Sequence, residues 1–296
     1  MIPCWCLLLL ICGIGGLCVL EAIRSARAVG KLLHPPRKSV TLPERTRDFA
    51  ALTEVSFITS DRLTLRGWYL PSRNHAAIVL THGFGENRTQ MLFEARLLAH
   101  HGYGVLLFDW RGHGQSDGDK VTWGDLERRD LIAALDFVTG RPDVDRHRIG
   151  AVGFSMGASV VVDVAGVDQR LAVLVIEGLD TSLEDELRWD DFCKWGPVSG
   201  LPAVWAMRRA GVDLDAVRPV DHLRVISPRP ILLVNGDKND IPPFMVKQLL
   251  QAAGEPIEYW VVKGAGHGEY ARIAPDEYAH RLLRLFDQAL LKPTVP

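Results

Sequence analysis

The chain has 296 residues, 47% of them hydrophobic, and its 34 basic and 36 acidic residues leave a net charge of −2. This mixed, nearly neutral balance gives no indication of nucleic-acid binding, so we expect no nucleic-acid partner. The length and apolar content predict one large domain with a sizeable core, or one domain with small additions.

The cysteines are concentrated at the N-terminus. Cys4, Cys6, Cys12 and Cys18 lie in the first 18 residues, and only Cys193 lies in the rest of the chain. This distribution excludes a disulfide framework within the body of the protein. No Cys/His spacing is typical of a zinc site, so we expect neither a metal nor a cofactor.

The first 22 residues are predicted to form a transmembrane anchor. Residues 2–20 contain no charged side chain and approach the ~20 apolar residues that cross a bilayer core as a helix. A cleaved signal peptide is the competing interpretation, because residues 26–28 (Ala-Arg-Ala) loosely fit a cleavage site. No lysine or arginine precedes the apolar run, which favours an uncleaved anchor.

The charges that flank the apolar run predict its orientation. Residues 23–48 read as a membrane-proximal linker, and its first part is basic. The basic residues are Arg24, Arg27, Lys31, Arg37 and Lys38. The positive-inside rule therefore predicts a single-pass protein whose body lies in the cytoplasm.

Residues 49–296 are predicted to form an α/β domain. Short apolar strands are predicted at 54–59, 63–70, 76–80, 104–108, 149–154, 171–176, 231–234 and 257–262. Amphipathic helices are predicted at 89–101, 126–139, 158–164, 243–253 and 276–291. This alternation predicts a mostly parallel twisted sheet with helices on both faces and an antiparallel start.

One long segment interrupts the alternation. Residues 179–223 are irregular and carry Trp189, Trp195 and Trp205. An insertion of this size between two core strands favours a cap over a functional site. Its tryptophans suggest an apolar acyl or aryl pocket, although a surface excursion packed on its own tryptophans would have the same composition.

The pentapeptide at 153–157, Gly-Phe-Ser-Met-Gly, follows a predicted strand and precedes a predicted helix. This G-x-S-x-G context is typical of a nucleophile elbow, which presents a serine hydroxyl at the start of a helix. The N–H groups and positive end of that helix favour developing negative charge. We therefore predict Ser155 as a nucleophile and the Met156 N–H as an oxyanion donor. The alternative is a Gly-rich turn between a strand and a helix that has no catalytic role.

Two further loops complete the predicted site. His267 lies between glycines directly after the last predicted strand, so it is the predicted base that takes the serine proton. The loop at 81–85, Thr-His-Gly-Phe-Gly, follows another strand, and its Phe84 N–H is the predicted second oxyanion donor. His82 is expected to be structural. The loop at 109–116 is expected to shape the pocket floor through internal polar contacts of Asp109 and Arg111.

Taken together, these motifs resemble those of the α/β-hydrolase superfamily, in order and spacing, across about residues 50–290. The nearest resemblance is to the serine-aminopeptidase-like and acyl-esterase branch with an N-terminal membrane anchor. The resemblance implies Ser155 as nucleophile, His267 as base, and Phe84 and Met156 as oxyanion donors.

The acid that should orient the histidine departs from the family pattern. Members of this branch usually carry G-x-x-D-x-x-x-P after the seventh strand, and residues 236–243 keep that frame with Asn239 at the acid position. We assign the acid to Asp240, one residue further on. Asp237 in the same turn and Glu177 at the end of the preceding strand stay open as alternatives.

The expected function is that of a membrane-anchored serine hydrolase that cleaves an ester-like bond of a lipophilic or acylated substrate through an acyl-enzyme. Thioester and amide substrates stay open, since the chemistry is shared. A non-catalytic binding or scaffold protein of the same fold is the alternative from another class, supported by Asn239. A haloperoxidase-like or C–C bond hydrolase is a third interpretation.

Overall fold

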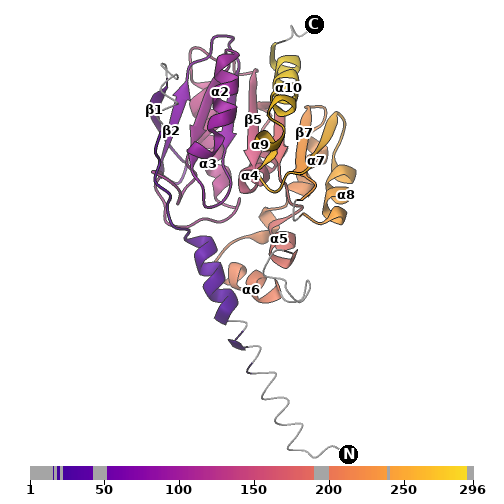
Figure 1. Cartoon of the computed structure of the whole chain (residues 1–296). Coiled ribbons are helices and arrows are strands. Elements are labelled where there is room, and N and C mark those ends of the chain that lie inside the picture. The colour runs from indigo at the N-terminus through magenta and orange to yellow at the C-terminus, as the bar shows by residue number, and fades with distance from the viewer. Residues whose placement is uncertain are drawn as a thin grey trace, which may run out of the picture.

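The computed structural model describes residues 16, 19–20, 23–42, 52–189, 200–238 and 241–291 (Figure 1). Most of the predicted membrane segment lies outside these residues. Among the residues that are described, no helix is both long enough and apolar enough to span a bilayer.

The described residues form an eight-stranded sheet in the order β1-β2-β4-β3-β5-β6-β7-β8. Its strands are β1 (Thr53–Ile58), β2 (Thr64–Leu70), β3 (Ala77–Thr81), β4 (Gly104–Phe108), β5 (Ile149–Phe154), β6 (Leu171–Glu177), β7 (Ile231–Gly236) and β8 (Ile257–Val262). Strand β2 pairs antiparallel with β1 and β4, and every other pair is parallel. The predicted α/β architecture with an antiparallel start is therefore confirmed.

Helices cover both faces of the sheet (Figure 1). One face is covered by α2 (Leu92–His100), α9 (Tyr270–Ile273) and α10 (Pro275–Phe286). The other face is covered by α3 (Glu127–Thr139), α4 (Met156–Val167), α7 (Pro219–Ile226) and α8 (Pro243–Ala252). Three short helical segments are also present: the 3-10 helices η2 (Arg88–Met91) and η5 (Leu214–Ala216), and the π-helix η6 (Asp287–Leu291).

The central strands are apolar throughout because both faces are covered. Every residue of β3, β4 and β5 is buried, as expected for parallel strands between two helical layers. In the register of the sheet, Thr81 pairs with Gly153, and Phe154 pairs with Glu177. The loops that follow β3, β5 and β6 therefore leave the sheet at one common edge.

The insertion between β6 and β7 has a small core of its own. It contains α5 (Leu183–Trp189) and α6 (Leu201–Arg209) ahead of η5 and α7. A helix at residues 23–33, within the predicted linker, buries Val29 and Leu33 in this core. Figure 1 shows this N-terminal helix running beside α6. The insertion and the N-terminal segment are thus packed as one unit.

Polar contacts continue this attachment toward the sheet. The Arg37 guanidinium donates hydrogen bonds to main-chain oxygens in the loop that follows β4. The Trp123 indole donates to the Leu32 carbonyl at 3.2 Å, and the Val121 amide donates to the Leu33 carbonyl at 2.8 Å. The N-terminal segment therefore connects the insertion to the loop that follows β4.

Candidate active site

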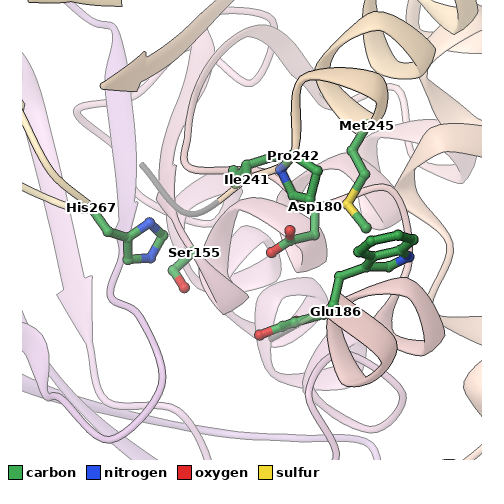
Figure 2. Close-up of a pocket in the computed structure, with 8 residues that line it drawn as sticks. Ser155, Asp180, Glu186, Ile241, Pro242, Met245 and His267 are labelled. Carbon is green, nitrogen blue, oxygen red and sulfur yellow. The ribbon is translucent and has the colours of Figure 1, made fainter. Parts of the chain in front are cut away.

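A pocket of about 230 Å³ opens at the common edge of the sheet. Its lining residues are Ser155, Asp180, Glu186, Trp189, Ile241, Pro242, Met245 and His267. Figure 2 shows the hydroxyl of Ser155 next to the imidazole of His267, with Asp180 and Glu186 facing the same space. The structure thus brings together the predicted nucleophile and the predicted base.

Ser155 occupies a strained turn between β5 and α4. Its backbone has φ 53° and ψ −120°, a conformation that L residues rarely adopt. A Cβ on Gly153 would lie 2.7 Å from the Gly157 carbonyl oxygen, and a Cβ on Gly157 would lie 2.7 Å from Thr81 Oγ1. Both glycines of G-x-S-x-G are therefore sterically required, as a nucleophile elbow demands.

The loop after β3 packs directly against this turn. A Cβ on Gly83 would lie 2.9 Å from Phe154 Cδ1 and 3.3 Å from the Cβ of Ser155. The main chain around Phe84 therefore runs beside the turn that continues into Met156. This proximity is what a two-donor oxyanion hole requires.

Two buried histidines support the loop after β3. The Trp110 amide donates to His82 Nε2 at 3.2 Å, and the Gly85 amide donates to His113 Nε2 at 3.0 Å. A nitrogen that accepts an N–H bond carries no proton of its own. Burial lowers the pKa of His82 to about 3 and the pKa of His113 to about 4. Both imidazoles are therefore neutral acceptors near neutral pH, and His82 has the structural environment that its sequence position suggested.

The His267 ring packs against the end of β5 and against the residue that follows β6. Its ring centroid lies 4.7 Å from that of Phe154. On another side, a Cβ on Gly178 would lie 2.6 Å from His267 Cε1. Gly178 has φ +62°, so glycine is favoured there by both the backbone and the ring above it.

Residues 78–281 match the model of the alpha/beta hydrolase family. The chain belongs to this family. The match begins in β3 and ends in α10, so it includes both Ser155 and His267. Family membership supports a hydrolase that acts on a small-molecule substrate.

Several curated relatives resemble this alpha/beta hydrolase. An uncharacterised protein of Mycobacterium tuberculosis is 31% identical over 232 residues, which cover 77% of this chain and 76% of the relative. Polyketide transferase ATR5 of Stachybotrys chlorohalonatus is 26% identical, covering 72% of this chain and 89% of the relative. Thiohydrolase aneE of Aspergillus aculeatus is 33% identical over 127 residues, covering 42% of this chain and 40% of the relative.

Among solved structures, the esterase Pf2001 of Pyrococcus furiosus superposes with a TM-score of 0.73 at 23% identity. The superposition covers 88% of this alpha/beta hydrolase and 99% of the esterase. GrgF from Penicillium sp. gives a TM-score of 0.66 at 21% identity, covering 81% and 99% of the two chains. At these identities the likeness establishes the shared fold.

The three candidate acids have different positions. Asp240, and with it Asn239, lies outside the described residues. The exposed Asp237 carboxylate accepts the Gly264 amide at 2.7 Å, so it holds the start of the loop that carries the histidine. The Glu177 carboxylate is buried and accepts the hydroxyl of Tyr278 at 2.5 Å.

The loop after β4 is stabilised by buried ion pairs. Asp109 pairs with Arg88 at 3.0 Å, and Arg111 pairs with Asp130 at 2.6 Å and with Asp61 at 2.8 Å. Internal contacts of Asp109 and Arg111 were expected from the sequence. Their partners lie on other elements, and no local sequence signal marks them.

The insertion supplies pocket residues that sequence reasoning missed. Asp180 and Glu186 line the pocket beside Trp189, whose ring centroid lies 5.0 Å from that of Phe244 on α8. The acidic first turn of α5 is visible in the sequence. The packing of α5 decides which of these carboxylates faces the pocket, and the acidic run alone does not reveal that packing.

Proposed function

We propose that this chain is a serine hydrolase that cleaves an ester-like bond through an acyl-enzyme. The observation that carries the proposal is the strained Ser155 elbow, which opens into the pocket that it shares with His267. A serine with φ 53° has a strained backbone, and this conformation is kept only because the surrounding packing enforces it.

The proposed reaction has two steps. Ser155 Oγ attacks the substrate carbonyl while His267 takes its proton, and the N–H groups of Phe84 and Met156 stabilise the oxyanion. His267 then protonates the leaving group, and an acyl-Ser155 ester remains. Water then attacks this ester with His267 again acting as base, the bond between the acyl carbon and Ser155 Oγ breaks, and His267 returns the proton to Oγ as the carboxylic acid leaves. Asp240 is proposed to orient His267 and to stabilise its positive charge.

Two observations bear on the acyl group. The pocket wall includes the apolar side chains of Trp189, Ile241 and Met245, which suit a lipophilic acyl or aryl group. Relatives carry the names thiohydrolase and polyketide transferase. These names favour an acyl thioester as a second candidate substrate beside an oxygen ester.

The membrane attachment is part of the proposal. It rests on residues 2–20, which contain no charged residue, and on the basic residues that follow them. The catalytic domain is accordingly proposed to lie in the cytoplasm. In sealed inside-out vesicles, external protease should digest the body. If the body is completely protected in inside-out vesicles and digested in right-side-out vesicles, the proposed orientation is wrong.

Activity of the full-length protein tests the reaction. We expect hydrolysis of short p-nitrophenyl esters or acyl thioesters that the Ser155→Ala variant loses by at least about 10³-fold. Aminoacyl amides belong in the same panel because the triad chemistry is shared. Hydrolysis by Ser155→Ala at the parent rate would exclude the proposed nucleophile.

A further inference from the structure

A buried hydroxyl lies between two carboxyl groups behind the proposed active site. Tyr278 Oη lies 2.5 Å from Glu177 Oε1 and 3.1 Å from Glu94 Oε1. Tyr278 is 2% exposed, Glu177 5% and Glu94 6%. Among the described residues, neither carboxyl group forms an ion pair with a basic side chain. Such an arrangement is costly unless protons are shared within it.

The number of hydrogens limits how this cluster can be bonded. A tyrosine hydroxyl has one hydrogen and can donate to only one of its two neighbours. Both contacts therefore form together only when one of the two carboxyl groups is protonated and donates to Oη while the hydroxyl donates to the other carboxylate. Burial raises the pKa of Glu94 to about 7 and the pKa of Glu177 to about 8, which agrees with one retained proton near neutral pH.

The three side chains belong to the three segments that carry the proposed catalytic groups. Glu94 lies on α2, which follows the Phe84 loop and η2. Glu177 ends β6, beside the turn that carries the nucleophile. Tyr278 lies on α10, which follows the His267 loop and α9. One hydroxyl thus connects segments that are far apart in the sequence.

The main chain at Glu177 continues this connection into the site. Its carbonyl oxygen accepts the Ser155 amide at 2.8 Å. The next residue, Gly178, lies directly against the His267 ring. A displacement of the main chain at Glu177 and Gly178 would therefore reach both the nucleophile and the base.

We propose that Glu94, Tyr278 and Glu177 form a proton-sharing clamp that positions the oxyanion loop, the nucleophile turn and the histidine loop relative to one another. This inference rests on the proposed hydrolase function and deepens it. The three are positioning residues, since they act through the segments that they join. A misplacement of about 1 Å at reacting atoms costs on the order of 100-fold in rate.

The clamp also implies a pH dependence. The ionisable groups that face it are Glu94 on α2, Glu177 on β6 and Tyr278 on α10, with Tyr270 of α9 and His267 adjoining Gly178. When the pH rises above the range in which the shared proton is held, two carboxylates face one hydroxyl and repel each other. We therefore expect the wild-type turnover to decline on the alkaline side.

The test compares conservative and disruptive variants of the full-length protein on a p-nitrophenyl ester. Tyr278→Phe removes the shared hydroxyl and should lower kcat about 10- to 100-fold, with KM changed by less than about twofold. Tyr103→Phe is the matched control, because that buried hydroxyl donates to Asp287 at 2.6 Å without contacting the catalytic segments. It should leave kcat unchanged.

Substitutions at Glu94 separate positioning from general destabilisation. The uncharged amide of Glu94→Gln can donate a hydrogen bond to Oη or accept one from it, so this variant should keep kcat near neutral pH and lose the alkaline decline. Glu94→Ala should lower kcat as Tyr278→Phe does. Wild-type kcat and an unchanged pH profile in folded Tyr278→Phe would overturn the clamp, and so would equal losses in Glu94→Gln and Glu94→Ala.

Fluorophosphonate labelling distinguishes this failure from failure of the proposed function. If wild-type Ser155 is labelled and the clamp variants behave as the wild type, the clamp is wrong and the hydrolase assignment stands. If wild-type Ser155 is not labelled, the hydrolase assignment fails first.

Discussion

The imidazole ring of His267 packs directly against Gly178. A Cβ added to Gly178 would lie 2.6 Å from His267 Cε1 and 2.9 Å from Nδ1, closer than nonbonded atoms approach. The histidine ring and the main chain after β6 therefore fix each other, and the proposed base has no room to settle toward the sheet.

The first prediction follows from this contact. Gly178→Ala should displace the His267 ring and lower kcat for ester hydrolysis by at least about 100-fold. Gly102→Ala is the control, because Gly102 also has a positive φ, +89°, but its added Cβ would meet side chains at 3.7 Å or more. Equal kcat values for the two variants would show that the ring does not depend on this contact.

The second prediction concerns the acid. If Asp240 orients His267, Asp240→Ala should lower kcat by about 10³- to 10⁴-fold. Asp237→Ala should lower it by about tenfold or less, because the structure uses that carboxylate to hold the Gly264 amide. Steady-state kinetics of both variants decides which carboxylate is the acid. A larger loss of kcat in Asp237→Ala than in Asp240→Ala would assign the acid to Asp237.

The third prediction concerns the N-terminal helix. Leu33 is 5% exposed in the core of the insertion, so Leu33→Ala should lower the free energy of unfolding by about 2–4 kcal/mol. Leu201→Ala is the control, since Leu201 on α6 is 43% exposed and should change stability by less than about 0.5 kcal/mol. Urea denaturation measures both. Equal, small effects would mean that the helix adds no stability to the insertion.

The fourth prediction is a pH dependence of stability. The pKa values of the neutral His82 and His113 are lowered by burial from 6.5 to about 3 and about 4, so the unfolded chain binds protons more readily than the folded chain. Stability is then full above pH 6.5 and falls as the pH drops toward those values. Between pH 6.5 and 5, each histidine should remove about 2 kcal/mol.

A substitution separates the contribution of one histidine to the pH dependence of stability from the contributions of other titrating groups. In urea denaturation at the two pH values, His113→Gln should show a fall in stability that is smaller by about 2 kcal/mol. The same substitution at the exposed His101 is the control. If His113→Gln loses as much stability as the wild type over this range, His113 is not a buried neutral imidazole.

The sheet could be predicted because its strands are short apolar runs bounded by turn residues. The predicted bounds of 104–108 and 149–154 match β4 and β5, where every residue is buried. Helix ends were less accurate. The predicted helix at 276–291 consists of α10 and the π-helical η6, and the one at 89–101 consists of η2 and α2. Local hydrogen bonding decides these boundaries, and hydrophobic periodicity does not report it.

Contacts between distant segments could not be predicted. Residues 23–33 mix basic, small and apolar side chains, and the burial of the apolar ones depends on α5 and α6 in the insertion. The sequence marks Glu177 as a candidate acid and does not mark Glu94, and only the packing of α10 joins the two through Tyr278. The nucleophile and the base could be proposed from the sequence because glycines flank both. Close packing requires three of these glycines, Gly153, Gly157 and Gly268.

The most direct test of the central claim is covalent labelling of the full-length protein with a fluorophosphonate probe, followed by mass spectrometry of the modified peptide. An activated serine nucleophile reacts with such a probe, and an ordinary surface or turn serine does not. We expect a single adduct on Ser155 that disappears in Ser155→Ala and forms far more slowly in His267→Ala. Absence of an adduct on Ser155, or labelling that is as fast in His267→Ala as in the wild type, would contradict it.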